Sequence, residues 1–141
     1  MEQRMLSILV ITLLCNGIHA MTRAQLKNSA KMFKKSCLGK VDVNEDLIVD
    51  IEKGQFVEDR SVMCYIACIY QMSQIVKNNK LNYEASLKQV DIMYPAEMKD
   101  AVKATITACK DVSKKYKDLC EASFYTAKCI YTADPKNFVF A

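Results

Sequence analysis

The sequence is poor in histidine, glycine and proline, and it has no tryptophan. Its 141 residues include one His, three Gly and two Pro. The one histidine, His19, lies in an N-terminal segment that we expect to be removed, so the mature chain would contain no imidazole. This excludes Ser-His-Asp and Cys-His catalysis and histidine zinc sites. Scarce glycine and proline favour long helices over many short strands.

The composition is that of an ordinary globular protein. Hydrophobic residues make up 51% and charged residues 26% of the chain. The net charge is +4, and the lysines are dispersed rather than gathered in a stripe with interleaved aromatic residues. This distribution disfavours nucleic-acid binding and favours a solvated basic surface.

The N-terminus has the three-part organisation of a secretory signal peptide. Arg4 precedes the apolar run 5–15, and a short polar stretch then ends at Ala20, after which we place the cleavage. The apolar run is too short to span a bilayer, so a membrane anchor is disfavoured. We therefore expect a signal peptide at 1–20 and one domain of 121 residues at 21–141, secreted and extracellular.

Capping residues and apolar periodicity predict six helices in the mature chain. Thr22 with Gln25 forms a capping box, and Asn44, Asp59, Asn82 and Asp118 are good N-cap residues. The third segment is apolar nearly all round, which predicts a central buried helix. The expected helical segments are 22–37, 44–54, 59–77, 82–94, 95–109 and 118–134.

The chain ends in the sequence NFVFA. Three consecutive large apolar residues, Phe138 to Phe140, predict that this tail docks on the domain. The alternative is a frayed, disordered end, which is usual for termini that nothing holds.

Six cysteines remain in the mature chain, an even number that suits a fully disulfide-bonded secreted domain. Cys64 and Cys68 lie one helical turn apart, which suits two bonds to other helices better than one bond to each other. A zinc site made only of cysteines is disfavoured in an oxidising compartment without a C-x2-C pair. The residues alone leave fifteen connectivities open.

The cysteine spacing C-x26-C-x3-C-x40-C-x10-C-x8-C resembles that of the six-cysteine insect odorant-binding proteins, which include the pheromone-binding proteins. The similarity covers the whole mature chain. It extends to Lys35-Ser36-Cys37, Gly54-Gln55-Phe56, Met63-Cys64-Tyr65, Cys120-Glu121, Ala127-Lys128-Cys129 and Ala133-Asp134-Pro135-Lys136.

This resemblance implies an all-α, six-helix, disulfide-linked fold that encloses an apolar pocket, with the C-terminal tail docking on the pocket. It implies the disulfides Cys37–Cys68, Cys64–Cys120 and Cys109–Cys129. It also implies ligand-binding residues at Ile66, Leu87, Val90, Tyr94, Met98, Val102, Thr105, Ala127, Ile130, Phe138 and Val139. Of these, Tyr94 and Thr105 carry hydroxyls for a ligand hydroxyl or carbonyl.

In relatives with a tail of this length, the terminal carboxylate bonds to groups on the first and third helices. The resemblance therefore implies a tail lock made of Tyr65, Asp134 and Ala141, with Lys31 or Lys34 adding charge. Some relatives release their ligand on acidification, partly through histidines. Carboxylates ordinarily titrate near pH 3–4, so a chain that relies on them should respond weakly to pH near neutrality.

The function that this reading predicts is a secreted carrier of small hydrophobic volatile molecules, without cofactor, metal or catalysis. Its partners would be the ligand and a membrane olfactory receptor, and a weak homodimer stays open. From the residues alone, the apolar stripes favour a filled core, because such stripes are usually packing, and it is the family resemblance that reverses this preference. The alternatives are therefore a secreted helical signalling protein and a non-olfactory carrier of the same fold.

Overall fold

The computed structural model describes residues 21–141, so the expected signal peptide lies outside the described residues. The described chain forms five α-helices, three 3₁₀ turns and one short hairpin. The α-helices are α2 (Arg23–Leu38), α3 (Arg60–Met72), α4 (Tyr83–Met93), α5 (Ala96–Cys109) and α6 (Leu119–Ala133). The turns are η1 (Glu45–Leu47), η2 (Ile51–Lys53) and η3 (Ser113–Lys115), and the strands are β1 (Val76–Lys77) and β2 (Lys80–Leu81).

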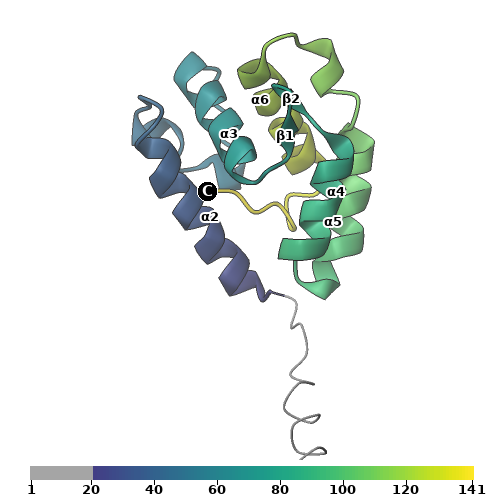
Figure 1. The fold of residues 1–141 in the computed structure, drawn as a ribbon. Coiled ribbons are helices and arrows are strands. Elements are labelled where there is room, and N and C mark those ends of the chain that lie inside the picture. Colours follow the sequence, from purple (N-terminus) through teal and green to yellow (C-terminus); the bar gives the residue numbers. More distant parts are fainter. Residues whose placement is uncertain (1–20) are drawn as a thin grey trace, which may run out of the picture.

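The elements surround the C-terminal segment (Figure 1). The long helices α3 and α6 pack closely against each other, and α2 packs against α3. On the opposite side, α4 and α5 lie side by side as a second pair. The C-terminal segment runs between the α2 side and the α4–α5 pair and ends beside α2 and α3. This arrangement confirms the predicted all-α fold with a docked tail.

The predicted helix starts are confirmed by their capping hydrogen bonds. Thr22 and Gln25 form a complete capping box at α2. The side chains of Asp59, Asn82 and Asp118 each accept a hydrogen bond from a main-chain N–H in the first turn of α3, α4 and α6. Local sequence therefore determines where these helices begin, because these side chains satisfy donors that the helix itself leaves free.

Segment 44–54 is helical as expected, but it forms the two 3₁₀ turns η1 and η2 rather than one α-helix. Ile48 and Ile51 are both buried, and a spacing of three residues places them on one face when the pitch is three residues per turn. Gly54 ends the segment with a φ of 90°, a left-handed conformation that glycine adopts readily.

The expected helix 59–77 ends earlier than predicted, at Met72. Asn78 and Asn79 both have positive φ values and form the turn of the β1–β2 hairpin, in which Val76 pairs with Leu81. Asparagine tolerates this conformation, and two consecutive left-handed residues suit a tight hairpin. Val76 therefore belongs to the hairpin, and Ile75 lies just before it, so neither residue continues the helix.

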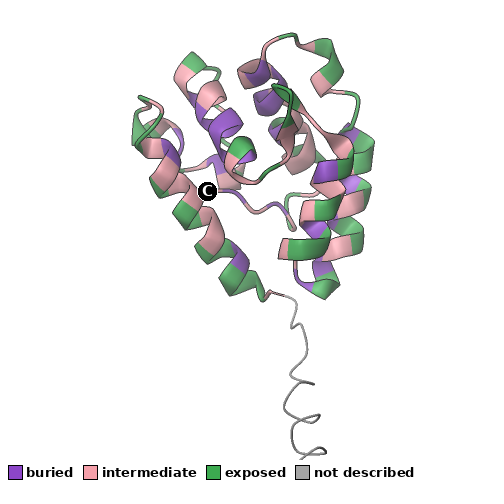
Figure 2. Ribbon diagram, viewed as in Figure 1, coloured by how far each residue is buried: buried purple, intermediate pink, exposed green. Residues whose placement is uncertain are grey.

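The core lies mainly along α3, which is buried on most of its surface, as its nearly all-apolar sequence predicted (Figure 2). Val62, Tyr65, Ile66 and Phe124 are completely or almost completely inaccessible to solvent. Burying one such side chain contributes roughly 1.5–3 kcal/mol to stability. The buried residues of α3 and α6 therefore form the centre of the core, against which residues of α2, of segment 44–54 and of the C-terminal segment pack.

Three disulfides connect the helices in series. Cys37–Cys68 joins α2 to α3, Cys64–Cys120 joins α3 to α6, and Cys109–Cys129 joins α5 to α6. This is the pairing that the family resemblance implied. Cys64 and Cys68 do bond to two different helices, as their one-turn spacing favoured. Of the α-helices in residues 21–141, α4 alone contains no cysteine.

An ion pair also joins the N-terminal ends of α3 and α6. Arg60 donates two hydrogen bonds to Asp118, at 2.5 and 2.9 Å. Together with the N–H of Glu121, the Arg60 guanidinium lowers the pKa of the Asp118 carboxyl to about 2. Both side chains are largely exposed, so solvent screening keeps the contribution of this pair to stability small.

We expect the stability that this pair contributes to decrease as the pH falls. The folded pKa of Asp118 lies below that of an unfolded chain, so the contribution is present above about pH 4 and is lost as the pH falls towards 2. Asp118→Asn keeps an N-cap of similar quality but removes the charge. Urea unfolding should show the variant slightly less stable at pH 7 and equal to wild type near pH 2. A gap of the same size at both pH values would contradict this.

Within residues 21–141, no helix is long and apolar enough to cross a bilayer. In the same residues, no three His, Cys, Asp or Glu side chains are grouped so that they could hold a metal ion.

Candidate functional site

A cavity of about 250 Å³ lies between the C-terminal segment and the surrounding helices. Its walls come from α2, the end of α3, the β1–β2 hairpin, α4, α5, α6 and the last residues of the chain. Small-molecule sites are typically concave, mostly apolar and lined by few polar groups. The volume suits one apolar molecule of modest size.

Helical periodicity explains which side chains face this cavity. On α2, Leu26, Ala30 and Phe33 follow at i, i+4 and i+7, and all three line it. On α5, the stripe Val102, Thr105, Ile106 and Cys109 faces the same space. Such apolar stripes ordinarily pack against each other in a filled core. Here the elements that face them lie far enough away to leave a cavity.

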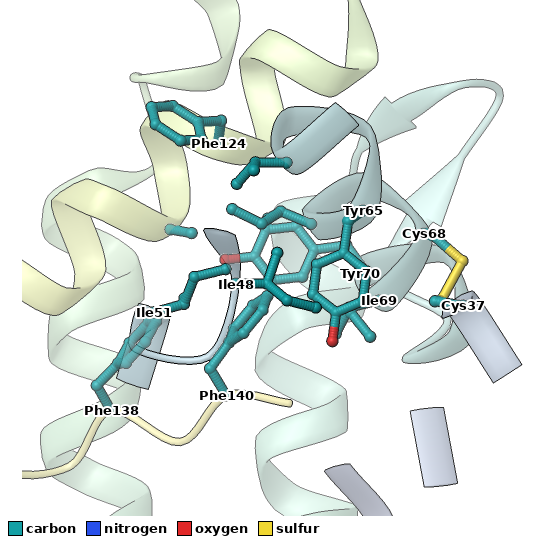
Figure 3. Close-up of a cluster of buried hydrophobic side chains, with 13 residues drawn as sticks. Cys37, Ile48, Ile51, Tyr65, Cys68, Ile69, Tyr70, Phe124, Phe138 and Phe140 are labelled. Atoms are coloured by element: carbon teal, nitrogen blue, oxygen red, sulfur yellow. A yellow bond between two sulfur atoms is a disulfide. The ribbon is translucent and has the colours of Figure 1, made fainter. Parts of the chain in front are cut away.

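The C-terminal segment forms one wall of the cavity and part of the core at once. Phe138 and Phe140 are buried, and their rings lie parallel with centroids 5.7 Å apart. Figure 3 shows both rings pointing from the segment towards Ile48, Ile51 and Tyr65. Phe138 also meets Phe56 and Tyr131 edge to face, and Phe140 meets Tyr65 and Tyr70.

Hydrogen bonds hold this segment at both ends. At its start, Arg23 donates to the carbonyl of Lys136 at 2.6 Å, and Asp134 accepts from Asn137. At its end, the Tyr65 hydroxyl donates to the main-chain oxygen of Ala141 at 2.9 Å. Burial raises the pKa of Tyr65, so its hydroxyl stays protonated and able to donate. Of the residues that the resemblance implied for the tail lock, Tyr65 and Ala141 therefore bond to each other at the end of the segment, and Asp134 bonds to Asn137 at its start.

That Lys31 or Lys34 adds charge to the lock stays a prediction. Lys34 forms an ion pair with Glu45, at 3.6 Å, and Lys31 is exposed on α2.

The structure places seven of the eleven predicted ligand-binding residues in the cavity lining. They are Val90, Tyr94, Val102, Thr105, Ile130, Phe138 and Val139. The hydroxyl of Thr105 donates to the carbonyl of Ala101 at 2.9 Å, so its own proton is already used within α5. It can still accept a hydrogen bond from a ligand.

The other four predicted residues lie outside the lining. Ile66 and Ala127 are fully buried in the α3–α6 core, and Met98 packs behind the wall with Val90 and Val102. Leu87 is half-buried on α4 and does not face the cavity. Contact of these four with a ligand stays a prediction.

Sequence reasoning missed part of the lining. Segment 22–37 was predicted to be helical, but none of its residues was assigned to the site. Ile75 was placed in the expected helix 59–77, and Leu81 lies between two expected helices and was assigned to neither. Tyr70 was missed because α3 is apolar on all sides, so its sequence does not indicate which face of the helix meets the cavity.

Three tyrosines line the cavity from different elements: the buried Tyr70 and the half-buried Tyr83 and Tyr94. Tyr94 follows the last turn of α4 and takes an extended conformation before Pro95, as residues before proline do. Burial raises the pKa of Tyr94 to about 12, and burial with the nearby Tyr94 raises that of Tyr70. Both hydroxyls are therefore protonated at every physiological pH.

The chain is similar to insect odorant-binding proteins in sequence. The pattern of the PBP/GOBP family matches residues 19–133. General odorant-binding protein 72 of Anopheles gambiae is 36% identical over 121 residues, which cover 86% of this chain and 99% of that protein. General odorant-binding protein 19a of Drosophila melanogaster is 33% identical over 122 residues, which cover 84% of this chain and 83% of that protein.

Solved structures agree with the sequence comparisons. Odorant binding protein 5 of Apis mellifera superposes with a TM-score of 0.78 at 28% identity, covering 86% of this chain and 99% of that one. Odorant binding protein 4 of Chrysopa pallens gives a TM-score of 0.76 at 31% identity, with the same coverage.

Proposed function

The chain belongs to the PBP/GOBP family, and from this membership we propose that it is a secreted carrier of small hydrophobic odorants or pheromones. It takes up ligands that dissolve poorly in water and moves them through aqueous lymph towards olfactory receptors. Binding and release are its whole mechanism, and no covalent step is involved. The signal peptide at 1–20 would direct it to the extracellular space.

The observation that carries this proposal is the apolar cavity under the docked C-terminal segment. A secreted signalling protein of this size would have its helix stripes packed together, since protein interiors are close to crystal density. Three disulfides hold the helices around the space, which favours a cavity that persists without ligand. A carrier that serves a tissue other than an olfactory organ would use the same cavity.

Displacement of a fluorescent apolar probe, N-phenyl-1-naphthylamine, tests this function directly. A carrier binds the probe saturably at micromolar concentration and releases it to competing odorants. Absence of saturable binding would favour the signalling alternative. Detection of the protein in antennae or in other tissues distinguishes an olfactory carrier from a non-olfactory one.

Blocking the cavity should abolish probe binding without unfolding the protein. Ile106 lines the cavity from α5 and is half-buried, so Ile106→Trp has room to place part of its ring in the space. We expect probe affinity to fall by at least about tenfold, because even one methylene in an apolar pocket is worth 10-fold or more. Titration of probe fluorescence measures the change.

Ile92→Trp is the matched control. Ile92 is 57% exposed on α4 and does not line the cavity, so the same substitution should leave probe affinity within about twofold. Equal losses in both variants would mean that the probe binds outside the cavity.

A further inference from the structure

Helix α2 carries charge of one sign only, although lysines are dispersed over the chain as a whole. It contains no acidic side chain and a basic strip of five cations: Arg23, Lys27, Lys31, Lys34 and Lys35. Lys27, Lys31 and Lys35 follow at i, i+4 and i+8, so like charges are neighbours on the helix surface, which destabilises a helix. Arg23 lies in the first turn, where the helix dipole favours an anion. Helix stability therefore does not explain this pattern.

The segment that follows α2 has the opposite charge. Residues 42–52 contain no basic side chain and an acidic strip of five anions: Asp42, Glu45, Asp46, Asp50 and Glu52. The two strips are neighbours, because Lys27 pairs with Glu52 at 3.1 Å. A second pair joins Lys34 to Glu45 at 3.6 Å. The edge of the fold that α2 forms therefore has a basic strip beside an acidic one (Figure 1).

Each strip keeps two charges without a partner in its own chain. Within residues 21–141, four exposed side chains of the strips form no ion pair, namely Lys31, Lys35, Asp42 and Asp46. Each element also carries a large apolar side chain in water, Met32 at 72% and Val49 at 62% exposure. A partner that covered this edge would pair the free charges and bury apolar surface.

We propose that this edge is a dimer contact, in which the basic strip of one copy lies against the acidic strip of a second copy. A two-fold contact is isologous, so each strip meets its complement in the other copy, and the contact is made twice. Lys31 and Lys35 of each copy then face Asp42 and Asp46 of the other. This inference does not depend on the carrier function.

The charge pattern favours a second copy over an anionic membrane. A bilayer rich in acidic lipids is negative over its whole surface, so it attracts the basic strip and repels the acidic strip beside it. Helices that bind in the membrane interface also insert an apolar face. The apolar face of α2, with Leu26, Ala30 and Phe33, lines the cavity instead. A fitting partner presents both signs, and a second copy of this chain does so by symmetry.

The experiment measures the monomer–dimer equilibrium of the mature chain by sedimentation equilibrium at pH 7.5. It is run at low salt and in about 1 M NaCl, where the Debye length is only about 3 Å. Two variants reverse the free charges of one strip each. The basic-strip variant combines Lys31→Glu with Lys35→Glu, and the acidic-strip variant combines Asp42→Lys with Asp46→Lys. Both keep the pairs that Lys27 and Lys34 form within the chain.

Lys77→Glu with Lys80→Glu is the matched control. These exposed lysines face each other across the β1–β2 hairpin and form no ion pair within residues 21–141. The control therefore changes the net charge as much as the basic-strip variant does, and it exchanges one like-charge pair for another. Circular dichroism and thermal unfolding confirm that each variant is folded.

Wild type should dimerise at low salt and dissociate in high salt, because exposed ion pairs are screened. Each strip variant alone should raise the dimer Kd at least about tenfold, since every attractive charge pair between the strips becomes repulsive. An equimolar mixture of the two strip variants should form a heterodimer, because each reversed strip then faces its complement. The control should match wild type within about twofold and form no heterodimer with the acidic-strip variant.

Three results would overturn the inference. The first is a wild type that stays monomeric at low salt up to about 1 mM. The second is a dimer that the strip variants leave unchanged, or a mixture of them that fails to pair. The third is a monomeric wild type that binds vesicles of phosphatidylcholine and phosphatidylglycerol through the basic strip, which would assign that strip to a membrane. Probe binding, which tests the carrier function, is measured separately and is unaffected by these outcomes.

Discussion

Phe140→Ala should lower the free energy of unfolding by about 3–5 kcal/mol, the usual cost of removing a buried phenylalanine ring. Phe140 is 9% exposed and contacts Tyr65, Tyr70 and Phe138, so its loss leaves a void at the centre of the core. Because the same ring lines the cavity, probe affinity should fall together with stability. Urea unfolding and probe titration measure the two effects on one variant.

Val139→Ala is the control within the same segment. Val139 is only half-buried and packs with the smaller cluster around Val102, so it contributes less to the core. Its loss should affect stability much less than that of Phe140. If the two variants were equally stable, the segment would be held by its hydrogen bonds at Arg23 and Tyr65 and not by its aromatic rings.

Gly54→Ala should destabilise the protein by about 2–4 kcal/mol, which combines backbone strain with overpacking. Gly54 has a φ of 90°, and a Cβ there would lie 2.3 Å from Cε1 of Tyr131. The Tyr131 ring cannot easily move, because it packs on Phe56 and Phe138 and donates to the carbonyl of Lys53. Thermal and urea unfolding measure the loss.

A double-mutant cycle with Tyr131→Ala separates the two causes. In the Tyr131→Ala background the clash is gone, so Gly54→Ala should cost only the strain of its positive φ, about 1–3 kcal/mol. Gly39→Ala is the matched control, because a Cβ there meets Ser36 O at 3.6 Å and Lys35 O at 4.0 Å, both ordinary van der Waals contacts. An equal loss at Gly39 and Gly54 would contradict the structural account.

The predictions for Phe140 and Gly54 concern residues that are linked by a chain of side-chain contacts. Tyr131 links the Gly54 turn to Phe138, and Phe138 stacks on Phe140 beside the cavity. The turn after η2 therefore supports the wall under which a ligand would lie. A change at Gly54, which does not line the cavity, should weaken ligand binding through this contact.

The sequence by itself determined the local features of this protein. Thr22, Asp59, Asn82 and Asp118 mark helix starts because a capping side chain satisfies its own neighbouring N–H groups. The composition of segment 59–77 predicted the buried helix, although the helix ends at Met72, and the apolar end predicted a docked tail. The residues left the cysteine pairing open, and the family resemblance supplied the connectivity that the structure contains.

Only the tertiary structure decided which apolar residues line a cavity and which fill the core. Val102 and Met98 belong to the same face of α5, yet one lines the space and the other packs behind it. Periodicity gives the direction of a side chain but not the distance to the opposite wall, which depends on how separate helices are placed. For the same reason, periodicity could not assign Tyr70 to the site, because its helix is apolar on all sides. Its place in the cavity lining depends on how α4 and the C-terminal segment pack around the same space.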